Sequence, residues 1–224
     1  MDINNIEKYM DFSSTLASEH EEDGSVSEDN AHWIAATWTR NFMVSDPLLD
    51  WLDLYGEEKG FKKDKEYEGY DERMDFSLFI RDKGVSFENA VIKHFSSLMP
   101  VYTVGGKIPG ETTSDRPKVL SQTIDAMKSG KPLIYQPNLS NATNFTWGYP
   151  DLIIRSDKLR EIFPESISEE ESKIGAPGIG LWSCHYRVID IKFTTLPFNK
   201  GGDLSTSDDS IWSYMAQVYI YNMA

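Results

Sequence analysis

Two strand-like segments that carry charged side chains set the strongest limit on how this chain can fold. The first is YPDLIIRSD, residues 149–157, and the second is YRVIDIKFT, residues 186–194. Each is apolar enough to be a buried strand, yet Asp151 interrupts the first, and Asp190 and Lys192 interrupt the second. Because an unpaired charge is costly to bury, these side chains must pair with one another or bind a cation.

The alternation of side chains along a strand puts Asp190 and Lys192 on one face of the second segment. The simplest interpretation is a buried ion pair with no further role, because Asp-x-Lys is a common combination. Asp151 alone could cap a turn, and Glu88 alone would be a half-exposed carboxylate at the edge of a helix. Taken together, the three acids and the lysine are the components of a divalent-metal hydrolase, because hard cations prefer oxygen ligands.

The composition predicts a globular protein. The 224 residues are 40% hydrophobic and 12% aromatic, and no apolar run reaches the roughly 18 residues that a membrane span needs. The single cysteine, Cys184, excludes an internal disulfide, a four-cysteine zinc site and an iron–sulfur cluster. In the absence of a signal-like N-terminal segment, these features predict an intracellular protein of the cytoplasm or nucleus, with Cys184 as a small buried side chain.

The acidic charge is concentrated near the N-terminus. Of the net charge of −14, residues 1–30 contribute −8, from nine acids and one base, and predict a mobile acidic tail before a single domain at 31–224. Residues 101–160 carry a net charge of +3 instead. The net charge argues against a nucleic-acid partner, but its distribution weakens that objection, because the local field matters more than the total when a polyanion docks. The lack of a clear basic surface still counts against such a partner.

Hydrophobic periodicity predicts an α/β fold with a mixed central sheet, flanked by helices and preceded by a helical segment. The expected strands are 132–139, 149–155 and 184–194, with a short strand at 101–106. The expected helices are 4–12, 45–56 capped by Ser45, 86–98 capped by Ser86, 117–129 and 207–224. A charged connector at 57–75 and an acidic insertion at 157–180 separate these elements. Because the last expected helix runs to the end of the chain, we expect a domain of a longer protein.

Four short motifs in a fixed order resemble the PD-(D/E)XK nuclease superfamily. They are Gly84-x-x-x-Glu88, Gly148-x-x-Asp151, Asp190-Ile-Lys192 and Gln217-x-x-x-Tyr221, and the last is similar to the RecB-like exonuclease branch. The segment 35–52 is similar to the one that opens many RecB-like domains, so the resemblance covers roughly residues 33–224. The chain departs from the pattern in lacking a histidine ahead of Glu88 and the four cysteines of the iron–sulfur members.

The resemblance implies a restriction-endonuclease-like core and a metal-dependent deoxyribonuclease. It places Lys192 where it orients or activates the attacking water, and it places Gln217 and Tyr221 one helical turn apart along the site. On the residues alone, that helix face simply buries Tyr221 and solvates Gln217. The implied ligands for one or two Mg²⁺ or Mn²⁺ ions are Glu88, Asp151, Asp190 and the backbone carbonyl of Ile191.

The expected partner is DNA, as a single strand or a duplex end, together with further domains or a helicase-like protein. Trp147, Trp182 and Tyr149 are candidates for stacking on unpaired bases, although each is equally well explained as an ordinary core or surface residue. The candidate phosphate contacts are Lys107, Arg116, Lys118, Arg155, Lys158, Arg187 and Lys200.

Three functions remain open at this point. The favoured one is an exonuclease or end-processing nuclease, which in this family leaves 5′-phosphate and 3′-hydroxyl products. A structure- or sequence-selective endonuclease on the same fold is the alternative enzyme. A catalytically silent nucleic-acid-binding module is the alternative of another class, and the acidic set argues against it because converging carboxylates repel phosphate unless a metal is bound.

Overall fold

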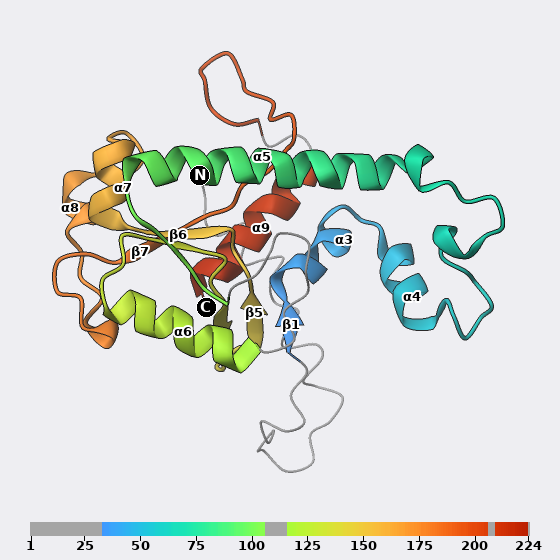
Figure 1. The fold of residues 1–224 in the computed structure, drawn as a ribbon, viewed down its shortest axis with the longest axis horizontal. Coiled ribbons are helices and arrows are strands. Elements are labelled where there is room, and N and C mark those ends of the chain that lie inside the picture. The colour runs from blue at the N-terminus through green and yellow to red at the C-terminus, as the bar shows by residue number, and fades with distance from the viewer. Residues whose placement is uncertain (1–32, 106–115, 206–208, 224) are drawn as a thin grey trace, which may run out of the picture. The chain divides into compact units, whose positions relative to one another are not determined.

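The part of the chain that the structure describes has an α/β fold with two mixed sheets and flanking helices (Figure 1). The computed structural model describes residues 33–105, 116–205 and 209–223, which belong to one compact unit, Trp33–Ala224. The expected tail at 1–30, the expected helix at 4–12 and Lys107 lie outside the described residues.

The helical segments lie mostly in the first half of the described chain and at its end. In chain order they are η2 (Ala36–Trp38), α3 (Thr39–Met43), α4 (Pro47–Tyr55), η3 (Asp64–Glu66), η4 (Glu72–Met74), α5 (Phe76–Leu98), α6 (Arg116–Lys128), α7 (Ser156–Ile162), α8 (Glu169–Ser172), η5 (Pro177–Ile179) and α9 (Asp209–Met223).

The strands are short and form two sheets. They are β1 (Ile34–Ala35), β2 (Val101–Thr103), β3 (Leu133–Tyr135), β4 (Leu139–Asn141), β5 (Thr146–Gly148), β6 (Leu152–Arg155) and β7 (Tyr186–Ile189). In the larger sheet, of order β2-β3-β6-β7, β2 is parallel to β3 and the other pairs are antiparallel. In the smaller sheet, of order β1-β5-β4, β1 is parallel to β5 and β4 is antiparallel to it. Three strands of the larger sheet, β3, β6 and β7, lie within the segments that the sequence predicted for the central sheet.

Alternate side chains of β3 and β6 bury the two faces of the larger sheet against different helices. Leu133, Leu152 and Ile154 cluster with Phe95 of α5, whereas the intervening residues of the same strands cluster with α6. Figure 1 accordingly shows α5 and α6 on either side of β6 and β7. Each large aliphatic side chain buried in this way contributes roughly 1.5–3 kcal/mol, so both faces of the sheet are held by hydrophobic packing.

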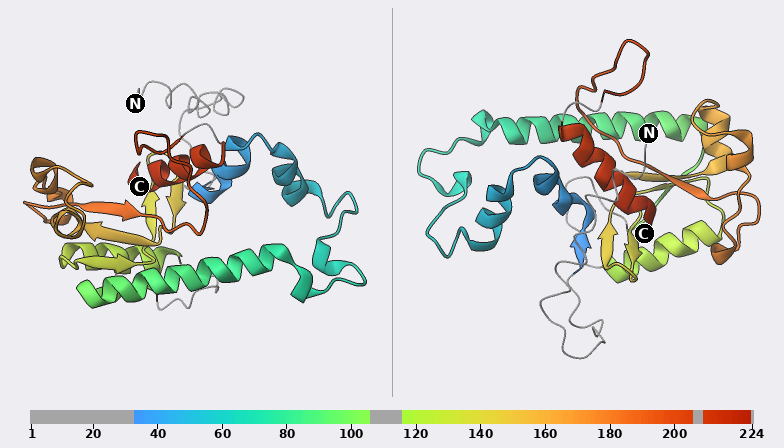
Figure 2. Two further views of the ribbon diagram at one scale, coloured as in Figure 1. Left: turned by 90° about the horizontal axis from the view of Figure 1, so that it is seen from above. Right: turned by 180° about the vertical axis from the view of Figure 1, so that it is seen from behind.

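Helix α9 covers the smaller sheet and brings Tyr221 against β5. Figure 2 shows α9 beside β5, and the Tyr221 side chain is 2% exposed in a cluster with Ala36 and Ile220. A Cβ atom on Gly148 would lie 2.1 Å from Cε1 of Tyr221, so only glycine permits this close approach. The glycine of the second sequence motif therefore has a packing function.

The run at 132–139 is not one strand, and that prediction is wrong. β3 ends at Tyr135, Gln136 takes a left-handed backbone with a φ of 52°, and the chain continues as β4 in the other sheet. The physical reason is Pro137, which has no N–H to donate to a neighbouring strand and therefore interrupts a central strand.

Helix α5 begins ten residues earlier than the sequence predicted for the helix at 86–98. Its cap is Asp75, whose carboxylate accepts hydrogen bonds from two backbone N–H groups of the first turn. Ser86 is not a cap, because its hydroxyl lies inside the helix and donates to the carbonyl of Asp82. The helix continues through Gly84, since one glycine costs only about 1 kcal/mol in a helix of this length.

The other expected helices are observed with small shifts at their ends. Those expected at 45–56, 117–129 and 207–224 are α4, α6 and α9. Ser45 is not the cap of α4, because it has a φ of 58° and the helix begins at Pro47. The acidic segment 157–180 is folded rather than an irregular insertion, since it contains most of α7 and all of α8 and η5. Cys184 is buried, as expected.

The two motif glycines should respond in opposite directions to alanine. Gly148→Ala should lower the free energy of unfolding by about 1–3 kcal/mol, because the new methyl group overlaps the Tyr221 ring. Gly84→Ala should raise it by up to about 1 kcal/mol, because the nearest neighbouring atom of a Cβ there is 4.0 Å away and alanine favours the helix. Urea denaturation of both variants checks this pair, and equal effects would contradict the packing described for Tyr221.

Candidate active site

Asp151 and Asp190 lie next to each other at one end of the β6–β7 pair. Asp151 immediately precedes β6, Asp190 immediately follows β7, and the pairing register ends with Leu152 opposite Ile189. Continuing the antiparallel register by one step brings the two aspartates opposite each other. Gly148 and Pro150 predicted a turn that brings Asp151 to a strand end, and β6 does begin directly after it. Asp190 was expected inside a strand at 184–194, but β7 ends at Ile189, so neither carboxylate interrupts a buried ladder.

Asp151 carries the strongest electrostatic signal of the site. The pKa of its carboxyl group is raised to about 7, first by burial and then by the negative charges of Asp190 and Glu88. The backbone N–H of Ile191 donates a hydrogen bond to Oδ2 of Asp151, and this bond and the Lys192 ammonium group act in the opposite direction. Three acids from distant parts of the chain thus influence one another, and a cation among them would favour the ionised form of Asp151.

Glu88 is presented from α5 toward the end of β3. Its Oε1 accepts a hydrogen bond from the Tyr135 hydroxyl at 2.7 Å and another from Nε2 of Gln136 at 3.1 Å. Burial, followed by the hydrogen bond to Glu88, raises the pKa of the Tyr135 hydroxyl, so this group stays protonated and donates. These two contacts hold the carboxylate of Glu88 next to the end of β3, the strand that pairs with β6.

Tyr135 and Gln136 are residues of this site that the sequence motifs did not identify. Gln136 holds its left-handed backbone directly before Pro137, a strained combination that often marks functional positions. Its Oε1 is buried and accepts no hydrogen bond from the described residues. The proline within an otherwise strand-like run was the available signal, because it marks a break in the sheet next to the acidic cluster.

Lys192 lies between the acids and α9. Its Nζ atom is 2.8 Å from Oδ2 of Asp190 as an ion pair, 3.4 Å from Oε1 of Gln217 as a hydrogen bond, and 5.4 Å from the ring centre of Tyr214. The ion pair lacks hydrogen-bond geometry, so Oδ2 of Asp190, although buried, accepts no hydrogen bond from the described residues. The Asp190 side chain is 5% exposed and that of Lys192 is 29% exposed, so the lysine side chain is partly accessible to solvent.

The last motif forms one connected chain of hydrogen bonds. Nε2 of Gln217 donates to the Tyr221 hydroxyl at 2.7 Å, and that hydroxyl donates to the carbonyl oxygen of Tyr149 at 3.4 Å. Because Gln217 also accepts from Lys192, the helix fixes the position of the lysine amine. Contact between the side chains of Gln217 and Tyr221 was expected from their spacing of four residues, and the structure has it.

The donor chemistry of the site suits a hard divalent cation. Asp190 offers a buried oxygen without a hydrogen bond, Asp151 is destabilised as an anion by its neighbours, and all available donors are oxygen atoms. Among the described residues, however, no three side chains of histidine, cysteine, aspartate or glutamate are grouped as a metal cluster. The acids are engaged by Tyr135, Gln136 and Lys192 in this arrangement, so binding of a metal would require them to exchange these partners.

The candidate phosphate contacts do not all lie near the acids. Arg116 is placed between two tryptophan rings, as described below. Arg187 forms an ion pair with Glu171 at 2.8 Å. Lys118 and Lys200 are exposed. Of the stacking candidates, Trp182 is 82% exposed, whereas Trp147 and Tyr149 are half-buried and their rings meet edge-on, with centres 5.8 Å apart.

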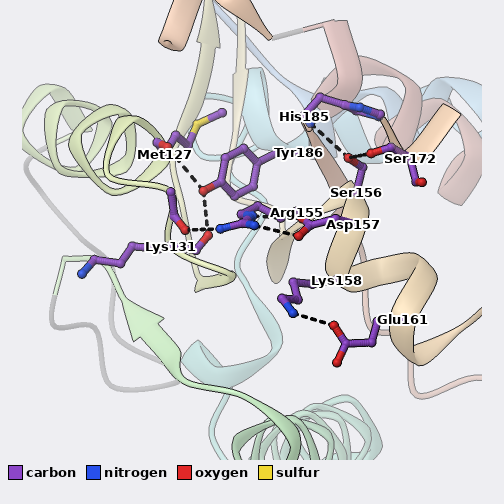
Figure 3. A network of polar contacts seen from close by, with 11 residues as sticks. Met127, Lys131, Arg155, Ser156, Asp157, Lys158, Glu161, Ser172, His185 and Tyr186 are labelled. Carbon is purple, nitrogen blue, oxygen red and sulfur yellow. Dashed lines mark hydrogen bonds and ion pairs between the residues drawn. The ribbon is translucent and has the colours of Figure 1, made fainter. Parts of the chain in front are cut away.

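Arg155 closes the opposite end of the β6–β7 pair (Figure 3). Its guanidinium group binds the Asp157 carboxylate at 2.7 Å and the Gly130 carbonyl at 2.9 Å. Tyr186, which pairs with Arg155 in the register, donates its hydroxyl proton to the Lys131 carbonyl at 2.6 Å. These bonds join the end of α6 to the sheet, and Arg155 is separated from Asp151 by the length of β6, about 13 Å at strand spacing.

The same network continues into the helices after β6. The Ser156 hydroxyl donates to the Ser172 carbonyl at 2.7 Å and accepts from the backbone N–H of His185 at 3.0 Å (Figure 3). Lys158 pairs with Glu161 on the same helix. Arg155 and Lys158 therefore serve this packed corner in the structure, at a distance from the acidic residues.

No protein-family model, curated protein or solved structure matches this chain. None of the described helices combines the length and the apolar character that crossing a membrane requires.

Asp151→Asn should stabilise the metal-free protein at neutral and alkaline pH. Because the folded state holds the Asp151 proton more tightly than the unfolded state does, this group makes the wild type less stable as the pH rises from about 4 to about 7. The asparagine variant lacks that loss and should be more stable than the wild type above about pH 7, by at most about 4 kcal/mol. Denaturation in EDTA across this pH range measures it.

The control for this prediction is Asp125→Asn, which changes an exposed aspartate on α6. It should follow the wild-type profile. A stability difference between Asp151→Asn and the wild type that does not change with pH would contradict the electrostatic interpretation of the acidic cluster.

Proposed function

We propose that the chain is a PD-(D/E)XK nuclease with a restriction-endonuclease-like core, which hydrolyses DNA phosphodiester bonds with Mg²⁺ or Mn²⁺. The observation that supports this most directly is the pairing of Asp190 with Lys192 beside Asp151, at the end of two adjacent strands. The charge of Glu88, on α5, also raises the pKa of the Asp151 carboxyl group. Carboxylates, an amine and adjacent strand ends are the parts that metal-assisted hydrolysis of a phosphodiester needs.

The position of each residue in the site suggests its role in the reaction. Asp151, Asp190 and Glu88, with the Ile191 carbonyl, would hold one or two divalent ions, which when bound polarise the phosphate and lower the pKa of a water molecule. Lys192 would hold the attacking water and assist in removing its proton. Gln217 of α9 accepts one hydrogen bond from the lysine and is itself held by Tyr221, whose hydroxyl donates to the Tyr149 carbonyl.

The raised pKa of Asp151 favours an enzyme over a silent binding module. An ion pair between Asp190 and Lys192 that served only the fold would gain nothing from a second buried carboxyl group, that of Asp151. Ionising Asp151 in this place is unfavourable unless a cation compensates for the burial and the like charges. Such an expensive arrangement is typical of functional sites, whereas a protein that only binds DNA would avoid negative charge near phosphates.

Lys192→Ala should reduce metal-dependent DNA cleavage by at least about 100-fold, because general acid–base groups contribute that much or more. The assay is a time course on labelled linear single-stranded and duplex DNA with Mn²⁺, and with EDTA as the blank. Lys173→Ala, which removes an exposed lysine from a surface ion pair, should cut like the wild type. A Lys192→Ala protein that is folded and cleaves at the wild-type rate would remove Lys192 from the mechanism.

Closed circular DNA in the same assay separates the two kinds of nuclease, since only an endonuclease nicks a substrate without ends. We expect linear DNA to be degraded and circles to survive. Nicked circles would show instead that the protein is an endonuclease on the same fold. A wild-type protein that binds DNA but does not cleave any of these substrates would support the silent binding module.

Asp190→Asn should lose most of the thermal stabilisation that Mn²⁺ gives the wild type. A ligand at about 100 times its dissociation constant stabilises a folded protein by roughly 2.7 kcal/mol, which is readily measured as a rise in Tm. Asp203→Asn, at an exposed turn, provides the matched control and should keep the full shift. Equal Mn²⁺-dependent shifts in Asp190→Asn and the wild type would exclude Asp190 as a ligand.

A further inference from the structure

A guanidinium group is held between two indole rings beside the smaller sheet. Cζ of Arg116 lies 4.8 Å from the ring centre of Trp33 and 5.0 Å from that of Trp147. Two further rings support the indoles edge-on: Phe145 meets Trp33 at 5.7 Å and Tyr149 meets Trp147 at 5.8 Å between ring centres. Cation–π contacts of this kind hold the guanidinium by its faces and leave its N–H edges available.

Side chains alternate along β5, so the aromatic cluster around Arg116 and helix α9 lie on different faces of this strand. Gly148 faces α9, where it contacts Tyr221, so the preceding Trp147 points to the opposite face of the strand. Arg116 is the first residue of α6 and meets Trp147 there. Trp33 immediately precedes β1, the parallel neighbour of β5, and completes the pair of indoles.

The electrostatics of Arg116 call for an anion. Among the described residues it makes no ion pair and no hydrogen bond, and its two cation–π contacts are with Trp33 and Trp147. A guanidinium with unused N–H groups matches the oxygen atoms of a phosphate in two parallel hydrogen bonds.

We propose that Arg116 is the binding site for a backbone phosphate of a single nucleic-acid strand that runs into the candidate active site, an inference that rests on the proposed nuclease function. The flanking rings favour a nucleic acid over a free anion, because bases of an unpaired strand stack on aromatic side chains and a bare phosphate does not. Arg116 supplies the charge, and Trp33 and Trp147 supply both its rigid mounting and an apolar neighbourhood for the adjacent bases.

The spacing along the chain fits one continuous strand. Trp147 precedes Asp151 by four residues, so their Cα atoms are at most about 14 Å apart. That distance spans only a few nucleotides of a single strand. Between Trp147 and Asp151, the carbonyl group of Tyr149 accepts a hydrogen bond from Tyr221. The aromatic cluster around Arg116 and the acidic cluster are therefore held by the same short segment. A strand fixed at Arg116 would therefore present a nearby phosphodiester to the acids.

The test compares Arg116→Gln with Arg81→Gln, which removes a charge from an exposed arginine on α5. Fluorescence anisotropy with a labelled single-stranded oligonucleotide in EDTA gives the dissociation constant at several salt concentrations. Arg116→Gln should weaken binding by about 10-fold and reduce the slope of log K against log salt by about 0.7, the value for one phosphate contact on a single strand. Arg81→Gln should change neither quantity.

Arg116→Lys keeps the interpretation testable if the glutamine variant does not fold. Lysine retains a cation over the rings but cannot form the two parallel hydrogen bonds, so we expect it to keep the salt slope and bind more weakly than the wild type. Thermal unfolding shows which variants are folded. Wild-type affinity and salt slope in a folded Arg116→Gln or Arg116→Lys protein would overturn the proposal.

Cleavage assays on the same proteins separate this inference from the nuclease function. If the wild type cleaves and Arg116→Gln has an unchanged KM, the phosphate site is rejected and the nuclease stands. If the wild type binds the strand through Arg116 but cleaves no substrate, the site stands as a binding site and the nuclease is rejected. If the wild type neither binds nor cleaves the oligonucleotide, both are rejected; if it cleaves without binding in EDTA, only the phosphate site is rejected.

Discussion

The antiparallel pairing of β6 with β7 is the constraint on which the candidate site depends. It brings together two aspartates that are 39 positions apart in the sequence, and it does so at the strand ends, where the backbone N–H of Ile191 is available to Asp151. Burial of Asp151, together with the negative charges of Asp190 and Glu88, raises its pKa, and the Ile191 N–H and Lys192 only partly offset this. The hydrophobic packing of both sheet faces must therefore sustain an electrostatic cost that the fold itself does not need.

The two ends of this strand pair differ in how well their polar groups are satisfied. At one end, Arg155, Tyr186 and Ser156 bind carboxylates and carbonyl groups in a closed network. At the other, buried oxygens of Gln136 and Asp190 accept no hydrogen bond from the described residues, and like charges face one another. Since buried polar groups normally find partners, the second end is the one built to receive something from outside the chain. The ions proposed above would supply the missing positive charge.

The sequence was sufficient to identify the acids, the lysine and the α/β class, because strand alternation and helix periodicity are local signals. Asp190 and Lys192 do pair, and Gln217 does contact Tyr221, as their spacing indicated. The sequence could not show the second sheet, because a break at Pro137 sends the chain from one sheet to another and the choice depends on packing. The role of Tyr135 was hidden for the same reason: its hydroxyl meets Glu88 across 47 positions of the chain.

The three residues of β5 connect the two parts of the proposed substrate path. Gly148 admits the Tyr221 ring, which through Gln217 positions Lys192, the proposed catalytic lysine, while Trp147 on the opposite face contacts Arg116. A side chain larger than hydrogen at 148 would displace α9, and a shift of β5 would move both features together. The acidic net charge of −14 argues against a nucleic-acid partner only if binding requires many contacts. A strand needs only a few well-placed contacts, and a guanidinium held rigidly by two indoles loses little entropy when a phosphate binds.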